Sequence, residues 1–292
     1  MTLPAWRPLR WALIGAVAAI ALLNASLVLG TIRYMASGGG GEDFGTFLRV
    51  AGLANPFDYG GWRWSPVAAW GMPALIGLGL PVLTALKFGV LPLFGWRGLL
   101  IGTSWPFWFD VAAGNILTFV LVVAWFAWRG NRVAMVAFLI LTLLMPRPIM
   151  LPLAAWLLWK EPWTRLPFGA LFTVHAGLVL VSGYGGDWIG RLLAISGELT
   201  HQANVGPSHW IGVAWVPIGI ALAVWLTRRG KIGLASLAAS PYLFPYYLLF
   251  GALELAPHPL RDDADLAEAV RQHLHAVPAA GLGPEAEGQR PT

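Results

Sequence analysis

The chain has 292 residues, of which 57% are hydrophobic and only 11% are charged. Soluble domains carry about 25% charged residues, so this composition predicts an all-α, polytopic integral membrane protein. The net charge of +5 comes mostly from short basic clusters between apolar segments, which gives no support to nucleic-acid binding, and the absence of cysteine excludes disulfides and thiolate metal sites.

The first apolar segment, residues 11–30, follows Arg7 and Arg10 and is long enough to cross the hydrocarbon core of a bilayer. A cleaved signal peptide has a shorter apolar region. We therefore expect a retained first span in the plasma (inner) membrane, with the N-terminus in the cytoplasm. The loop after it, residues 31–65, is then expected on the non-cytoplasmic face.

Two adjacent carboxylates, Glu42 and Asp43, follow a run of glycines in this loop. The loop is also rich in aromatic residues, which gather at membrane interfaces and around sugars. The carboxylates are either a solvated pair beyond a flexible linker or groups placed to take a proton from a hydroxyl of a membrane-bound substrate.

Further spans are expected at residues 66–80, 84–104 and 112–128, where a basic cluster returns the chain to the cytoplasmic side. Asp110 and Asn115 flank the outer end of the last of these spans. Each is either a structural group, as an interfacial cap or a helix-packing hydrogen bond, or part of a binding site.

Residues 132–159 are too few to cross the membrane twice at 1.5 Å per residue, and Pro146 and Pro148 interrupt them on either side of Arg147. This pattern predicts a broken helical hairpin whose tip lies within the membrane thickness. Irregular backbone at that depth is tolerated only where it is buried inside the protein or lines a water-filled cavity. Arg147 is then either a structural partner of a nearby group or a ligand for phosphate.

A similar interruption, at Pro241 and Pro245, divides residues 232–255. A second broken hairpin and a single kinked span both fit this segment. Between the two interrupted segments, His175 lies in the middle of an expected span, where we interpret it as a satisfied core histidine.

The remaining elements complete the predicted topology of about nine or ten spans. A membrane domain, residues 1–255, contains further spans at 166–183 and 210–227, joined by a second external loop at 184–209. Residues 256–292 are polar and are expected to form a soluble, partly disordered tail.

Six short motifs, taken in order over residues 11–255, resemble glycosyltransferase family 87. This family is related to the polyprenyl-phosphate-mannose-dependent mannosyltransferases and has the C-type glycosyltransferase fold. The motifs are Glu42-Asp43-Phe44, Asn55-Pro56-Phe57, Trp64-Ser65-Pro66, Gly114-Asn115-Ile116-Leu117, Arg147-Pro148 and Ser240-Pro241-Tyr242.

The resemblance implies an inverting membrane glycosyltransferase that moves a sugar, expected to be mannose, from a polyprenyl-phosphate donor to a lipid or glycan acceptor, with membrane lipids around it. Asp43 matches the catalytic aspartate of the family, and neither a cofactor nor a metal ligand is expected. The expected substrate-binding residues are Glu42, Asn55, Asp110, Asn115, Arg147 and Tyr242.

Two other functions remain open at the level of sequence. Broken helices around a site at the membrane midplane also occur in secondary transporters. A shorter, non-catalytic relative would bind the lipid carrier without transferring the sugar.

Overall fold

The computed structural model describes residues 6–60, 62–194, 199 and 201–257. Over these ranges the chain is helical and forms no strand, which confirms the all-α prediction. The chain divides into two compact units, Met1–Ala256 and Pro257–Thr292, and the first is described here. The tail predicted at 256–292 lies almost entirely outside the described residues.

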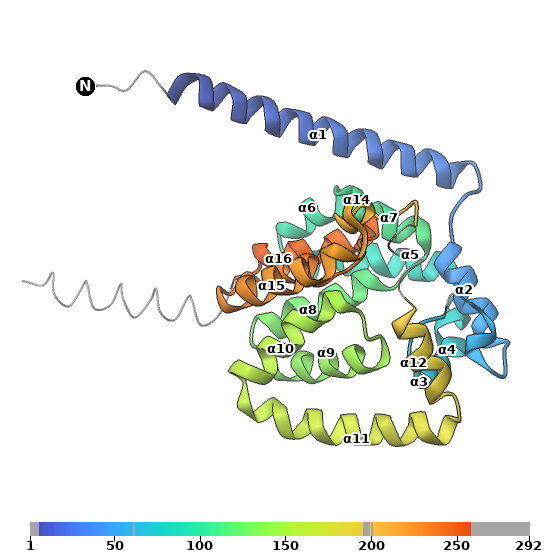
Figure 1. Cartoon of the computed structure of the whole chain (residues 1–292). Helices are drawn as coiled ribbons and strands as arrows, with labels where there is room; N and C mark the ends of the chain where they lie inside the picture. Colours follow the sequence, from blue (N-terminus) through green and yellow to red (C-terminus); the bar gives the residue numbers. More distant parts are fainter. Residues whose placement is uncertain (1–5, 61, 195–198, 200, 258–292) are drawn as a thin grey trace, which may run out of the picture. The chain divides into compact units, whose positions relative to one another are not determined.

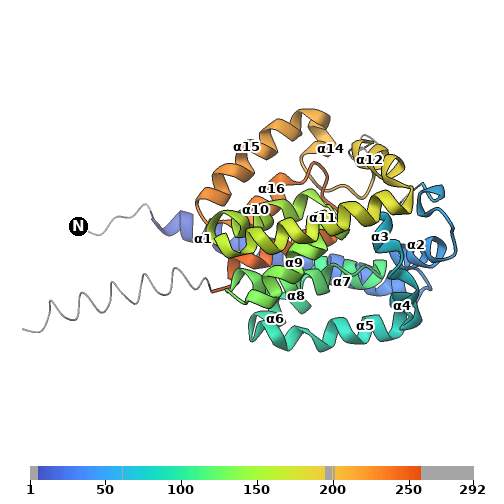
Figure 2. The ribbon, with the colours of Figure 1, turned by 90° about the horizontal axis from the view of Figure 1, so that it is seen from below.

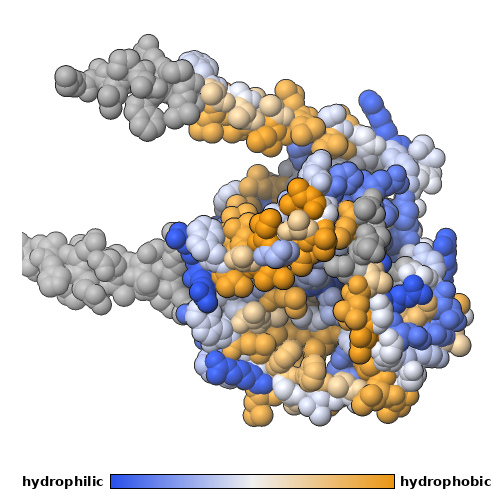
Figure 3. Space-filling view, viewed as in Figure 1, coloured by the Kyte–Doolittle hydropathy of each residue, from blue (hydrophilic) through white to orange (hydrophobic). Residues whose placement is uncertain are grey.

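Three helical stretches in the described part are long and apolar enough to cross a membrane. They are Arg10–Ala36 within α1 (Trp6–Ala36), Pro162–Ser182 including α11 (Arg165–Ser182), and Ser208–Arg228 including α15 (Trp215–Arg228). Hydrophobic residues cover α1 and the surface around α15 in Figure 3. These helices indicate a membrane protein, as the composition predicts.

The region of the expected spans 66–80 and 84–104 is more broken than the sequence predicts. It forms α3 (Pro66–Ala69), α4 (Met72–Gly77), α5 (Gly79–Gly89), η2 (Leu91–Phe94) and α6 (Arg97–Gly102). The helices before and after Gly79 are bent by 92° and together form one candidate broken span or re-entrant loop. Gly79 and Gly95 have positive φ, which ends regular helix at both positions.

The core is built around α8 (Leu117–Trp128), α9 (Arg132–Leu144), α10 (Leu151–Lys160) and α16 (Ile232–Ala239), which lie together in Figures 1 and 2. Their inward-facing residues are fully buried, for example Leu121, Phe138 and Leu157. The span predicted at 112–128 is a shorter helix, because the left-handed Gly114 separates α8 from α7 (Trp105–Ala113).

The predicted helix break at Arg147 is present, and the helices on its two sides, α9 and α10, contact each other. Helix α9 ends at Leu144, Arg147 is extended, and the chain resumes in η3 (Pro148–Met150) and α10. The backbone N–H of Ser65 donates to the carbonyl oxygen of Leu144 at 2.9 Å, which holds the 62–65 segment against the break.

The second interrupted segment is also a hairpin, not a kinked span. Its two arms, α16 and η6 (Pro245–Leu255), pack against each other. The N–H of Leu234 donates to Glu254 Oε1 at 3.1 Å, and a Cβ on Gly233 would lie 2.8 Å from the carbonyl oxygen of Phe250. The start of one arm therefore lies beside the end of the other.

His175 of α11 is buried, and its Nε2 lies 2.7 Å from Ser65 Oγ, in agreement with the predicted core histidine. The same hydroxyl accepts from the N–H of Val67 at the start of α3. This contact ties α11 to the segment that borders the first hairpin.

Candidate functional site

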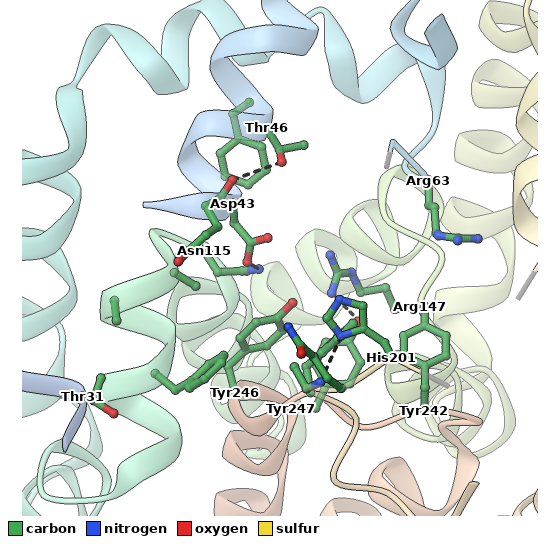
Figure 4. Close-up of a pocket in the computed structure, with 18 of the residues that line it drawn as sticks. Thr31, Asp43, Thr46, Arg63, Asn115, Arg147, His201, Tyr242, Tyr246 and Tyr247 are labelled. Carbon is green, nitrogen blue, oxygen red and sulfur yellow. Dashed lines mark hydrogen bonds between the residues drawn. The ribbon is translucent and has the colours of Figure 1, made fainter. Parts of the chain in front are cut away.

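A cavity of about 1090 Å³ lies between α1, α2 (Glu42–Ala51), α7 and the breaks of both hairpins. Figure 4 shows its polar side chains, which come from segments far apart in the sequence. Predicted site residues lining the cavity are Glu42, Asp43, Asn115, Arg147 and Tyr242.

Asp43 is held at the cavity by the chain before it. Residues 31–36, which we expected to be part of the external loop, belong to α1. The glycines that follow contact the end of α7 and do not form a free linker. The N–H of Gly41 donates to the carbonyl oxygen of Ala112 at 2.6 Å, and a Cβ on Gly40 would lie 2.7 Å from the same oxygen. Helix α2 then begins at Glu42, where carboxylates interact favourably with the helix dipole.

Asn115 positions the carboxylate of Asp43. Its Oδ1 accepts from the N–H groups of Ile116 at 2.7 Å and Leu117 at 3.1 Å, at the start of α8. This leaves Nδ2 to donate to Asp43 Oδ2 at 2.6 Å. The left-handed Gly114 (φ 68°) makes the turn that places Asn115 there.

Burial raises the pKa of Asp43 above the ordinary value of an aspartate. The hydrogen bond from Asn115 and the positive charge of Arg147 act in the opposite direction. Asp43 is therefore a partly desolvated carboxylate that gains from taking up a proton, as a general base requires.

Arg147 faces the cavity from the first hairpin break (Figure 4). Its guanidinium carbon lies 5.6 Å from the ring centre of Trp64 and 5.3 Å from that of Tyr247, and Nη1 donates to the Tyr247 hydroxyl. No carboxylate of the described residues forms a salt bridge with it. The guanidinium thus keeps donors for an anion, and a phosphate suits its planar geometry.

Glu42 and Tyr242 lie at the edges of the same space. Glu42 is exposed and accepts a hydrogen bond from the hydroxyl of Tyr34 on α1. Tyr242 comes from the break of the second hairpin, and its ring centre lies 6.0 Å from that of Tyr247.

Asn55, predicted to bind substrate, does not line the cavity. Its Oδ1 accepts from the N–H of Phe57 at 2.9 Å and caps η1 (Pro56–Asp58), and its Nδ2 lies 3.4 Å from Asp187 Oδ2. The side chain is therefore committed to the local turn and to α12 (Gly185–Leu193).

Asp110 does not line the cavity either, because it is fully buried in an ion pair that sequence reasoning missed. Lys87 Nζ lies 2.9 Å from Asp110 Oδ2 and also donates to the Asp110 carbonyl oxygen at 2.6 Å. The Thr118 hydroxyl donates to the same carboxylate at 2.7 Å. The structure thus buries Lys87 of α5 against α7.

Several further residues line the cavity that were not among the predicted site residues. His201 accepts from the N–H of Ala203 through Nδ1, which leaves Nε2 as its donor, and Arg63 Nη1 donates to the carbonyl oxygens of Arg191 and Ala194. The two prolines that interrupt residues 232–255 could have drawn attention to Tyr246 and Tyr247, which directly follow Pro245. The additional polar residues include Thr46, Tyr59, Arg63, His201, Tyr246 and Tyr247.

The described part of the chain holds no group of three His, Asp or Glu side chains with the geometry of a metal site. The cavity brings together two carboxylates, two guanidiniums, the imidazole of His201 and a set of phenols and amides. Comparison with known proteins found no matching family model, no matching curated protein and no matching solved structure.

Proposed function

We propose that the chain is a membrane glycosyltransferase of about nine or ten spans, with a C-type glycosyltransferase-like arrangement and a cytoplasmic N-terminus. It moves a sugar, mannose by the resemblance above, from a polyprenyl-phosphate carrier to a hydroxyl of a lipid or glycan acceptor on the non-cytoplasmic face. The observation that carries the proposal is the presence of Asp43 and Arg147 in one cavity.

In this reaction Asp43 takes the proton of the acceptor hydroxyl as that oxygen attacks the anomeric carbon. The bond between the anomeric carbon and the phosphate oxygen breaks, and polyprenyl phosphate leaves from the opposite face, so the configuration inverts. The leaving group needs no proton, because phosphate is stable as an anion. One base is therefore sufficient.

Arg147 stabilises the charge that develops on the departing phosphate oxygen. Its position beside buried aromatic rings lowers the local dielectric, which strengthens this interaction relative to water. Tyr247 accepts one of the guanidinium hydrogen bonds and fixes its direction. Losing such an oriented donor typically costs about 10²–10³ in rate.

The walls of the cavity also suit a sugar and a lipid carrier. Tyr59, Trp64 and Tyr246 offer aromatic surface for the apolar face of a sugar ring. Helix α1, which is exposed along its length and apolar, contributes Leu27 and Thr31 to the lining. The cavity is therefore bordered by a helix that can lie in lipid.

The experiment is transfer of radiolabelled sugar from polyprenyl-phosphate-mannose to endogenous lipid and glycan acceptors, in membranes carrying the wild-type chain or Asp43→Asn. The matched control is Asp58→Asn, because Asp58 is an exposed carboxylate of the same external segment and does not line the cavity. We expect Asp43→Asn to lose transfer by about 10²-fold or more and Asp58→Asn to retain most of it.

Full transfer by a correctly expressed Asp43→Asn would contradict the assignment of the base. Absence of transfer from the wild type, with binding of polyprenyl phosphate that depends on Arg147, would instead favour a carrier-binding or transport function.

A further inference from the structure

A second concave surface, a groove of about 720 Å³, runs between α10 and α15 outside the cavity described above. Its lining is almost entirely apolar, with polar side chains only near Thr227 and Arg228. It opens outward, since Leu151, Trp159 and Ile220 are each at least half exposed. In a membrane such a groove faces lipid.

The groove and the candidate site share one lining residue. Pro148 lines both the groove and the cavity. Pro241 lines the groove, and the next residue, Tyr242, lines the cavity. Arg147 precedes Pro148, so the cation proposed to hold the phosphate lies next to the residue that lines both spaces.

The length of the groove fits a hydrocarbon chain. From Pro148 to Trp159 along α10 the rise is about 16 Å at 1.5 Å per residue, roughly half the thickness of the hydrocarbon core. Trp159 and Arg228, at the far end, are residue types that mark a membrane interface. A chain that starts beside Arg147 could therefore follow the groove to the cytoplasmic boundary without leaving an apolar environment.

We propose that the groove between α10 and α15 binds the isoprenoid chain of the lipid carrier whose phosphate lies at Arg147. This inference rests on the proposed function and adds the surface that recognises the carrier by its chain. The shared residue Pro148, directly after Arg147, favours a single lipid that joins a phosphate to one hydrocarbon chain over an unrelated phospholipid. Binding would then increase with chain length.

The test is binding of citronellyl phosphate, with two isoprene units, and undecaprenyl phosphate, with eleven, to the detergent-solubilised full chain. Ala155 lines the groove and is exposed, so Ala155→Trp fills the groove without disturbing the core. The matched control is Ala170→Trp, on the exposed surface of α11 and outside both cavities.

We expect the wild type and Ala170→Trp to bind the long phosphate at least about tenfold more tightly than the short one, because burial of hydrocarbon increases affinity. Ala155→Trp should lose most of this difference and bind the short phosphate normally. Equal affinity for both lengths in the wild type, or an unchanged preference in Ala155→Trp, would overturn the inference and leave the proposed function standing.

Failure of the proposed function would look different, since neither phosphate would then bind the wild type in a manner sensitive to Arg147→Ala. Phosphatidylglycerol is the competitor that distinguishes the two kinds of lipid. If it displaces undecaprenyl phosphate at equal concentration, and Ala155→Trp weakens its binding equally, the groove is a phospholipid site and the inference is wrong.

Discussion

Asn115 donates a 2.6 Å hydrogen bond to Asp43 while its other amide atom accepts from two backbone N–H groups at the start of α8. Those backbone bonds identify Oδ1 and Nδ2, because only the oxygen can accept. The carboxamide is thus fixed with its donor toward the carboxylate. Helix α8 orients the proposed base through this one residue.

The pH dependence of transfer should therefore respond to Asn115. Asp43 acts as a base only when ionised, burial raises its pKa, and the Asn115 hydrogen bond favours the ionised form. In Asn115→Leu the pKa of Asp43 should rise further, so the acid limb of the rate profile should move to higher pH. The measurement is transfer rate against pH.

The control for that experiment is Asn131→Leu. Asn131 caps α9 by accepting from the N–H of Ala134 at 2.9 Å, and it does not line the cavity. It should lose stability of about 1 kcal/mol, as cap removal does, with no change in the acid limb. A shifted limb in this variant, or none in Asn115→Leu, would argue against the role of the Asn115 donor.

Arg147→Lys keeps the positive charge but replaces the planar fork by a single ammonium group. We expect weaker binding of polyprenyl phosphate, by about tenfold, and a larger loss in Arg147→Ala. The comparison variant is Arg229→Lys, because Arg229 also lies against an aromatic ring, that of Trp225, outside the cavity. Equal affinities for the Arg147 variants and the wild type would remove Arg147 from the phosphate site.

The buried pair between Lys87 and Asp110 should be a strong determinant of stability. Lys87→Met leaves the Asp110 carboxylate buried with only the Thr118 hydroxyl, which should cost about 3–5 kcal/mol. Adding Asp110→Asn removes the uncompensated charge and should restore much of the loss. Thermal unfolding in detergent measures both effects.

Lys231 and Glu254 provide the exposed comparison for this prediction. Their charged atoms are 3.6 Å apart, and Lys231 is 48% exposed. Lys231→Met should therefore change the free energy of unfolding by no more than about 1 kcal/mol. Similar effects of the two lysine substitutions would contradict the structural importance of the buried pair.

Gly114→Ala should impair both stability and transfer. The residue has φ 68°, and its new Cβ would lie 2.8 Å from the Cβ of Phe44, directly beside Asp43. Gly183→Ala should destabilise the backbone by a similar amount, about 1 kcal/mol, because Gly183 has φ 76°. Its new Cβ, however, would have no other atom within 4 Å. We expect reduced transfer only for Gly114→Ala, in activity measured per folded protein.

The two helix breaks were predictable because their cause is local. Two prolines around Arg147, and two more at Pro241 and Pro245, interrupt helix wherever the rest of the chain lies. The number of residues between basic clusters also restricted the first segment to a partial crossing. Both features depend on spacing that can be counted in the sequence.

The pair formed by Lys87 and Asp110 was not predictable in the same way. The two residues lie on different helices, and a lysine in an apolar segment is just as consistent with a helix end at the cytoplasmic surface. Sequence also cannot show that Asn55 is occupied by its own turn. These assignments depend on tertiary contacts.

Part of the site follows from residue type and part does not. Asp43 and Arg147 stand out because charged groups next to or within membrane segments cost free energy and are found mainly where they pair with another group or carry a function. His201 does not stand out, since loop histidines are common in such chains, and Tyr246 and Tyr247 are marked only by their position after Pro245. Only the fold brings them to the same cavity.

The most direct test separates donor binding from transfer in one preparation. Purified wild type, Asp43→Asn and Arg147→Ala are loaded with radiolabelled polyprenyl-phosphate-mannose, washed, and then given acceptor lipid extracted from membranes. We expect Asp43→Asn to retain the donor without transferring it, whereas Arg147→Ala should fail to retain it. Transfer by Asp43→Asn at the wild-type rate would contradict the role of Asp43 as the base.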